Sequence, residues 1–261
     1  MRYGVCADWK RAPELKQLGY DYIESGLSGL SCLQPAQLEQ AEMLLHANGL
    51  SMEAANRFLP SELRLCGEEA DPPAVREYAL RTLEIGARLG LKVAVLGSGG
   101  ARRCPEGYPP KKAREQLLYS LEMIGEAARQ YQVTIAVEPL NREECNQLNT
   151  LAETAALLRE LNCPNLRLTV DLYHMVMERE PLSVLQQVGS LIAHVHLNRP
   201  VKPRAFPARG DGYDYVPFIR ALRGIGYEGR VSIEAGYQDF QKDAGAALEL
   251  MQKSFSVKPE G

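Results

Sequence analysis

Four side chains of the kinds that bind metal ions stand at or directly after the ends of apolar segments in the second half of the sequence. They are Glu138, Asp171, His196 and Glu234, and successive members of the set are each about one strand-helix repeat apart. A charged group that follows an apolar run is costly to bury unless a partner neutralises it. Four such groups brought to one point would form a metal site.

The chemistry of this set indicates which ion it would prefer. Three carboxylates and one imidazole offer mainly oxygen donors and bring three negative charges before any metal is bound. Such a set suits Mn²⁺, Mg²⁺ or Co²⁺ better than Zn²⁺, which favours nitrogen and sulfur and stays open as an alternative. A single carboxylate at a strand end is most often a helix cap or an ion-pair partner. The prediction of one divalent ion, with Mn²⁺ as first choice, therefore depends on all four residues together.

The alternation of apolar patterns predicts the elements that would position these residues. Short apolar runs predict eight strands, at residues 3–6, 22–24, 51–55, 92–96, 134–137, 166–170, 193–196 and 231–233. The segments between them carry apolar residues at helical spacing, as Leu117, Leu121 and Ile124 do. Thr150 and Glu153 form a capping-box pattern that predicts the start of one helix.

The number of these units favours a barrel. Eight units over 261 residues give about 33 residues each, which is typical of a (β/α)₈ TIM barrel of ~250 residues. A doubly wound sheet would also alternate strands and helices, but no G-x-G-x-x-G pattern follows the first predicted strand. We therefore predict an α/β chain that forms one (β/α)₈ barrel domain over residues 1–261, with the candidate ligands at one mouth.

Composition and charge narrow the classes of partner. The 33 acidic and 30 basic side chains give a net charge of −3, whereas proteins that bind nucleic acid usually carry a basic stripe. No stretch approaches the ~20 apolar residues of a membrane span, and the N-terminus lacks the apolar segment of a signal peptide. The six cysteines are widely spaced without a C-x-x-C pair, as in proteins of a reducing compartment. We expect a cytoplasmic protein that binds neither nucleic acid nor membranes, with a homo-oligomer left open.

Four segments around the candidate ligands resemble the motifs of a known superfamily. They are Val137-Glu-Pro-Leu-Asn-Arg142, Val170-Asp-Leu-Tyr-His174, Ala193-His-Val-His-Leu197 and Ser232-Ile-Glu234. Together they resemble the xylose isomerase-like TIM barrels, and most closely the sugar phosphate isomerases and epimerases of the D-tagatose 3-epimerase and hydroxypyruvate isomerase type. The resemblance covers nearly the whole chain and is specific for the superfamily, but not for the substrate.

The resemblance implies roles for particular residues. In this family one divalent metal is bound by the glutamate of E-P-L-N-R, the aspartate of D-x-x-H, the second histidine of H-x-H and the glutamate of the last strand. Those positions are again Glu138, Asp171, His196 and Glu234. The family also places a glutamate six residues after the first ligand, and the D-x-x-H histidine, on oxygens of the substrate. The resemblance therefore implies that Glu144 and His174 bind the substrate.

Three further residues are candidates for contact with the substrate. The epimerases usually carry an arginine about six residues after the metal-binding histidine, where this chain has Lys202. Arg199 and Arg204 lie in the same loop, so contact from either stays open, and the substrate could be a sugar or a sugar acid. Asn56, after the third predicted strand, would touch the substrate or close an Asx turn.

These residue types suggest a reaction that moves a proton. A metal chelated by a substrate carbonyl and an adjacent hydroxyl acts as a Lewis acid and stabilises an enediolate. Carboxylates on opposite faces of the reacting carbon, Glu138 and Glu234, would then remove and return the proton. The predicted function is metal-dependent isomerisation or epimerisation of a small sugar or sugar derivative.

Three alternative functions stay open. A lyase resembling inosose dehydratase would begin with the same metal-assisted abstraction of a proton. A DNA-repair nuclease of the endonuclease IV type is disfavoured because its trinuclear zinc site needs many histidines, and this chain has four. A sugar-binding protein without activity is expected to have lost ligands, and all four are present.

Five other polar or aromatic residues rank below these candidates. His194 shares a strand face with His196 and is expected behind it or in the core. Glu24 and Trp9 would line the pocket or simply pack. Arg102 and Arg103, after the fourth predicted strand, could hold an anion, but a solvated arginine pair is the default expectation.

Overall fold

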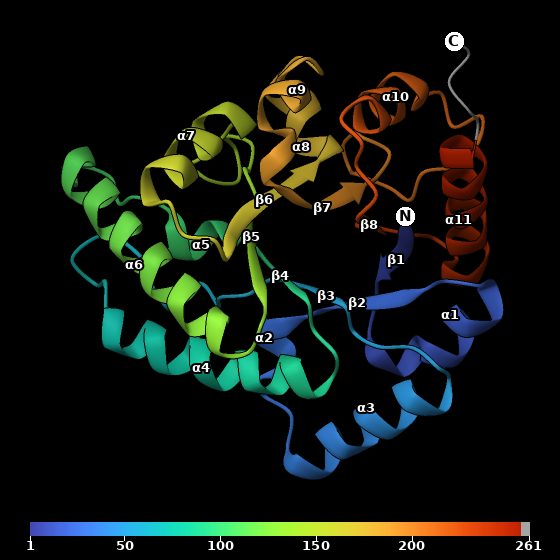
Figure 1. Cartoon of the computed structure of the whole chain (residues 1–261), viewed down its shortest axis with the longest axis horizontal. Coiled ribbons are helices and arrows are strands. Elements are labelled where there is room, and N and C mark those ends of the chain that lie inside the picture. Colours follow the sequence, from blue (N-terminus) through green and yellow to red (C-terminus); the bar gives the residue numbers. More distant parts are fainter. Residues whose placement is uncertain (257–261) are drawn as a thin grey trace.

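A closed barrel of eight parallel strands forms the centre of the molecule. The computed structural model describes residues 1–256. Each strand pairs with its neighbour in the sequence, and the first pairs with the last, so that the sheet closes on itself (Figure 1). The strands are β1 (Arg2–Cys6), β2 (Tyr22–Gly26), β3 (Ala54–Asn56), β4 (Val93–Leu96), β5 (Thr134–Val137), β6 (Leu166–Asp171), β7 (Ile192–Leu197) and β8 (Arg230–Ile233). The predicted (β/α)₈ barrel is confirmed.

Helices surround the barrel (Figure 1). The longer ones are α1 (Ala12–Leu18), α3 (Pro35–Ala47), α4 (Pro72–Arg88), α6 (Pro110–Gln130), α7 (Leu151–Leu161), α10 (Val216–Gly224) and α11 (Phe240–Ser256). The shorter ones are η1 (Trp9–Arg11), α2 (Leu27–Leu30), α5 (Gly99–Arg102), α8 (Leu172–Met177), α9 (Val184–Val188) and η2 (Gly189–Leu191). In α4 the buried face includes Val75, Ala79 and Leu83, whose spacing is that of an amphipathic helix on a core.

The predicted strand bounds differ from the structure by up to three residues, the most at the start of β3, and one predicted helix cap has a different partner. Strand β3 begins at Ala54 rather than at residue 51, because the carbonyl of Glu53 accepts hydrogen bonds from two successive residues of the next strand segment, Lys92 and Val93. The helix after β5 begins after Thr150 as predicted, with its hydroxyl accepting from the Glu153 N–H at 3.1 Å. The carboxylate of Glu153, however, accepts from the N–H of the preceding Asn149, so the reciprocal half of the capping box is shifted by one residue.

The end of the barrel where the strands begin is held by ion pairs. The Glu53 carboxylate accepts from the Nε atoms of Arg2, the first residue of β1, and Arg230, the first residue of β8, at 3.1 and 2.8 Å. Glu53 is buried, but the side chains of Arg2 and Arg230 are 47% and 24% exposed, so one buried carboxylate joins two partly solvated cations. These pairs hold one end of the barrel and leave the opposite mouth for the candidate ligands.

A long connection after β7 folds over that mouth. Bridges join Arg199 to Ala205 and Ala205 to Gly236, which follows β8. The loop is therefore tied to the ends of two strands, and Arg204, beside Ala205, is held close to the barrel axis. The fold thus carries one cation of this loop to the mouth.

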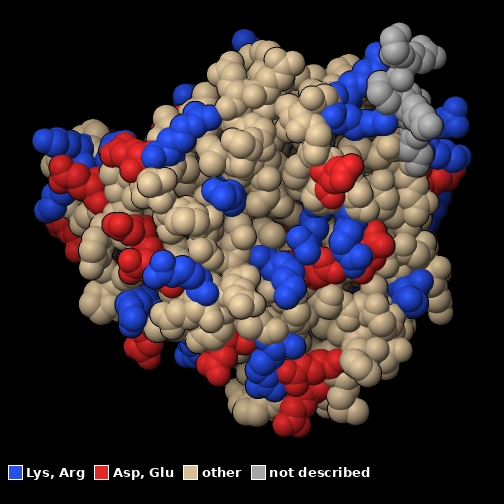
Figure 2. Space-filling model, viewed as in Figure 1, with Lys and Arg blue, Asp and Glu red and all other residues tan. Residues whose placement is uncertain are grey.

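The exposed side chains show no single dominant charge on the face viewed down the short axis of the molecule. Acidic and basic residues are interspersed there, often as neighbours (Figure 2). Among the described helices, none combines the length and apolarity that a membrane span requires.

Candidate metal centre and active site

The four predicted ligands converge at the mouth of the barrel. Glu138 directly follows β5, Asp171 ends β6, His196 lies near the end of β7 and Glu234 follows β8. One ligand atom from each lies within 4.8 Å of those of the others. The Nδ1 atom of His196 lies 2.8 Å from a Glu138 oxygen, 3.3 Å from Glu234 and 3.7 Å from Asp171. The barrel therefore brings together residues that are distant in the sequence.

The donors fit a divalent cation. Three carboxylates crowd around one imidazole, and the Glu138, Asp171 and His196 residues are almost wholly shielded from water. Buried like charges repel strongly unless a cation lies between them. An oxygen-rich set with a single nitrogen is the donor set that hard and borderline divalent ions accept. These four residues together would therefore hold such an ion.

Electrostatic surroundings set two of the carboxylates apart. Burial alone would raise the pKa of Asp171, but His174, His196 and Arg204 together hold that pKa below its ordinary value. Its Oδ1 also accepts from the backbone N–H groups of Tyr173 and His174, at 2.7 and 3.2 Å. The pKa of Glu234 is raised instead, because burial outweighs the attraction of the nearby cations. Asp171 is thus the more firmly ionised of these two ligands.

Behind the ligands, Glu24 binds both histidines of the H-x-H segment. Its Oε1 lies 3.0 Å from Nε2 of His196 and its Oε2 lies 2.8 Å from Nε2 of His194, and no part of the three side chains reaches solvent. Burial would raise the pKa of Glu24, but the two imidazoles hold it below its ordinary value. An ionised Glu24 places the proton of each ring on Nε2 and leaves Nδ1 of His196 facing the other ligands.

A second supporting contact comes from Asn56 at the end of β3. Its Nδ2 donates to Oε1 of Glu234 at 2.6 Å, and Asn56 also lines the cavity described below. The residue predicted to touch the substrate or close a turn thus holds a candidate ligand in place. Because this amide occupies Oε1, the other carboxylate oxygen of Glu234, Oε2, is the one that faces His196 and the other ligands.

A cavity of about 390 Å³ opens above the ligands, within the usual range of ~300–1,000 Å³ for ligand pockets. Its lining includes most of the predicted active-site residues: Asn56, Glu138, Glu144, His174, Arg204 and Glu234. Arg199 is not among the lining residues, and its Nε is buried without a hydrogen-bond partner. Of the two arginines left open by the sequence, the structure brings Arg204 to the cavity.

One residue of the E-P-L-N-R segment organises both predicted substrate contacts. The backbone N–H of Asn141 donates to Nδ1 of His174 at 3.1 Å, and its side-chain amide donates to Glu144 Oε1, also at 3.1 Å. Because Nδ1 of His174 is an acceptor here, we assign the ring proton to Nε2. Sequence reasoning missed this role of Asn141, although its position inside the recognised motif was the available signal.

Arg204 and Lys202 have different partners. The Nη1 atom of Arg204 lies 3.2 Å from Glu234 Oε2 and 3.4 Å from Asp171 Oδ2, and these carboxylates keep its pKa above the ordinary value despite burial. Lys202 pairs with Glu143, and both of these side chains are about half exposed or more. Position 202 thus carries a lysine that points elsewhere, but a cation still lies beside the ligands, because Arg204 supplies it two residues further along the chain.

The arginines after β4 correct one expectation. Arg102 is wholly buried, and its three guanidinium nitrogens have no hydrogen-bond partner among the described residues, so the predicted solvated pair is wrong. Arg103 is exposed and donates to the backbone carbonyls of Glu143 and Glu144, at 3.3 and 2.8 Å. It therefore holds the loop that carries Glu144.

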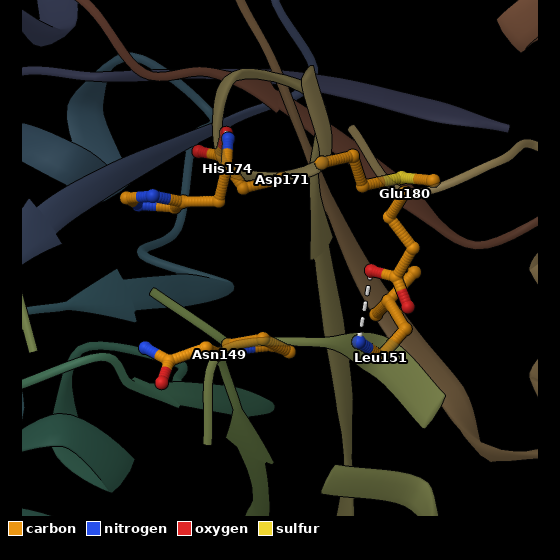
Figure 3. Close-up of a pocket in the computed structure, with 7 residues that line it drawn as sticks. Asn149, Leu151, Asp171, His174 and Glu180 are labelled. Atoms are coloured by element: carbon orange, nitrogen blue, oxygen red, sulfur yellow. Dashed lines mark hydrogen bonds between the residues drawn. The ribbon is translucent and has the colours of Figure 1, made fainter. Parts of the chain in front are cut away.

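A much smaller pocket shares His174 with the cavity lining and is also lined by Asp171. Its other labelled members, Asn149, Leu151 and Glu180, come from the start of α7 and the segment after α8 (Figure 3). Its volume of about 10 Å³ matches about one water molecule. The carboxylate of Glu180 accepts from the N–H of Leu151 at 2.9 Å, so this pocket belongs to the packing of helix ends.

Comparisons with known proteins agree with this architecture. The profile of the family described as xylose isomerase-like TIM barrel matches residues 13–254, and the chain belongs to that family. It is 27% identical over 242 residues to a probable ketose 3-epimerase of Synechocystis sp., covering 90% of this chain and 81% of the relative. It is 29% identical over 251 residues to the L-ribulose 3-epimerase of Methylomonas sp., covering 87% and 80%.

A solved structure shows the same fold over the whole length. It is that of D-psicose 3-epimerase with D-tagatose from Clostridium cellulolyticum H10, and the two chains superpose with a TM-score of 0.86. The sequence identity is 21%, and the match covers 98% of this chain and 100% of the other. The family and the fold are therefore established by independent comparisons.

Proposed function

We propose that this protein is a divalent-metal-dependent epimerase that inverts the carbon next to the carbonyl group of a small ketose or ketose derivative. One observation carries the proposal: of the four candidate ligands, Glu138 and Glu234 also line the cavity, whereas Asp171 and His196 do not. Two carboxylates from different strands thus reach the space available to a substrate, as removal and return of a proton require. The relatives named as ketose 3-epimerases support the choice of substrate class.

The ligand set supports the dependence on a metal. When bound, a divalent ion supplies positive charge that stabilises negative charge on the substrate oxygens as a proton leaves carbon. Glu138, Asp171, His196 and Glu234 would hold it, and Mn²⁺ is the ion that we expect first.

The proposed reaction transfers two protons at one carbon. One of the two glutamates takes the proton from the carbon next to the carbonyl, and the electron pair of the broken C–H bond passes into an enediolate. The other glutamate then donates a proton to the opposite face of that carbon, which inverts the centre. Exchange with water restores the starting protonation of Glu138 and Glu234 before the next turnover.

His174 and Glu144 are the residues that would orient the substrate. The Nε2–H of His174 would donate to a substrate oxygen, because its Nδ1 is occupied by Asn141. The Glu144 carboxylate accepts from the same asparagine and would accept from a substrate hydroxyl with its free oxygen. Both residues would fix which carbon lies between the two glutamates.

Turnover of a panel of ketoses in D₂O, followed by NMR, tests the reaction. We expect one deuterium on the inverted carbon of the product. Glu138→Gln and Glu234→Gln should each abolish epimerisation, while the remaining glutamate still exchanges the C–H of one epimer and not of the other. Metal content is measured in both variants as the control. Turnover without deuterium would point to hydride transfer, and a product that has lost water would identify a lyase.

A further inference from the structure

The outer part of the cavity differs chemically from the part next to the ligands. Its wall there comes from the connections after β2, β3 and β4 and includes Ser28, Arg57, Ser61 and Ser98. Arg57 is exposed, whereas Asn56, the preceding residue, is buried and touches Glu234. Arg57 therefore lies at the open side of the cavity, although the residue before it, Asn56, contacts a candidate ligand.

We propose that this wall binds an anionic group, a phosphate ester or a carboxylate, on the part of the substrate remote from the reacting carbon, with Arg57 as its charged partner. The inference rests on the proposed function in assuming that the reacting carbon lies between Glu138 and Glu234. It goes beyond that function because it selects sugar phosphates or sugar acids over neutral ketoses.

The two cations that line the cavity are in different states. Arg204 is already engaged by Asp171 and Glu234. The guanidinium of Arg57 makes no hydrogen bond and no ion pair with any of residues 1–256, although carboxylates are abundant in the same cavity. A planar guanidinium with free donors matches the paired oxygens of a phosphate or carboxylate. Arg57 is thus the cation that remains available to a ligand.

The backbone around Arg57 is fixed in an unusual conformation. Its φ of 52° lies in the left-handed region, which residues other than glycine seldom adopt without a structural or functional reason. Its carbonyl accepts from the N–H of Ser28 at 3.1 Å, and the N–H of Leu59 donates to the Ser98 hydroxyl at 2.9 Å. These bonds tie the connection after β3 to its neighbours on both sides.

The side chain of Arg57 lies over a glycine. A Cβ atom at Gly26 would lie 3.6 Å from Cδ and 3.8 Å from Nε of Arg57, so the guanidinium stem crosses the end of β2 at close range. The hydroxyl groups of Ser28 and Ser61 have no hydrogen-bond partner within the described part of the chain, and both residues line the cavity. One cation and two free hydroxyls are a suitable donor set for an anion.

Three substrates test the proposal: neutral D-fructose, D-fructose 6-phosphate and the ketohexuronate D-fructuronate. The two anionic sugars distinguish a phosphate from a carboxylate. We expect the wild-type kcat/KM for one of the two anions to exceed that for the neutral sugar by about 10-fold or more, the ratio that one charge-assisted contact supplies. Arg57→Gln should remove most of that preference and change kcat/KM for D-fructose less than about threefold. Arg220→Gln, an exposed arginine on α10 outside the cavity, is the matched control.

Calorimetric titration of the metal-free protein with D-fructose 6-phosphate and with D-fructuronate tests the anion subsite separately from the proposed epimerase activity. Binding of an anion that Arg57→Gln weakens and Arg220→Gln does not would uphold the subsite, even if no ketose is epimerised. Epimerisation of D-fructose with no preference for either anion, and no effect of Arg57→Gln on anion binding, would overturn the subsite and leave the proposed function standing.

Discussion

The two halves of the barrel contribute to the site in different ways. Strands β5 to β8 supply all four candidate ligands, each within one residue of the end of its strand. Strands β2 and β3 supply no ligand but hold two of them, through Glu24 on His196 and Asn56 on Glu234. Their following connections also build the outer wall of the cavity. One half therefore provides the reacting groups, and the other sets their orientation and the shape of the space above them.

This division predicts that damage to the ligand half has the largest effect. In a Glu138→Gln/Asp171→Asn double variant we expect loss of stoichiometric metal and a fall in kcat/KM of about 10³-fold or more, because a bound ion is worth several kcal/mol to such reactions. Elemental analysis after EDTA treatment and reconstitution with Mn²⁺ measures the metal content, and ketose turnover measures kcat/KM. Tight stoichiometric metal in the double variant would show that these residues are not the ligands.

Residues that would contact the substrate, but not the metal, should have the next largest effect. For His174→Gln and Glu144→Gln we expect a loss of about 2–4 kcal/mol in transition-state stabilisation, which is about 30- to 1,000-fold in kcat/KM. The Mn²⁺ content should stay at the wild-type level in both. Full activity in the two single variants would contradict the assignment of these residues to the substrate.

The supporting half should affect metal binding without abolishing it. Glu24→Gln replaces one acceptor by an NH₂ group, which cannot accept from a second imidazole N–H. Since removal of an outer contact of a ligating histidine typically costs about 10- to 100-fold in metal affinity, we expect a loss of that size. Competition with a chelator for Mn²⁺ measures it.

The opposite end of the barrel offers a matched control for that experiment. Glu53 is also a buried carboxylate with two cationic partners, but it lies where the strands begin. Glu53→Gln should lower the midpoint of thermal unfolding, because it removes the carboxylate that Arg2 and Arg230 share, and should leave the Mn²⁺ affinity unchanged. Equal effects of Glu24→Gln and Glu53→Gln on Mn²⁺ affinity would show that Glu24 acts through the stability of the fold and not through its contact with His196.

The same division explains how much of the site could be predicted from the sequence. The strands and the candidate ligands follow from local patterns, since each ligand type ends an apolar run and the repeat length identifies the barrel. The partner of His194 and His196 could not be predicted in this way. Glu24 lies 170 and 172 residues from them, and β2 is not adjacent to β7 in the sheet, so their contact across the barrel interior depends on side-chain packing in three dimensions.

Loop conformation accounts for the other differences. Arg199 and Arg204 are the same residue type in one loop, and the sequence offered no means of choosing between them. The bridges from Ala205 to Arg199 and to Gly236 belong to the loop conformation that brings Arg204 to the cavity. The burial of Arg102 also has no local signal, because arginine is seldom fully buried. Such positions are set by tertiary contacts of the loops and not by residue type.

The smallest expected effect concerns the lysine that departs from the family pattern. In Lys202→Ala we expect kcat/KM to change less than about twofold, because Nζ pairs with Glu143 outside the cavity lining, in an exposed setting where ion pairs contribute little. Arg204→Gln in the same loop is the comparison. It removes a cation 3.2 Å from Glu234 and should lower kcat/KM about 10-fold or more. The midpoint of thermal unfolding is measured alongside, because Asp171 and Glu234 both lose a cationic partner. A larger loss in Lys202→Ala than in Arg204→Gln would reverse the assignment and place Lys202 at the substrate.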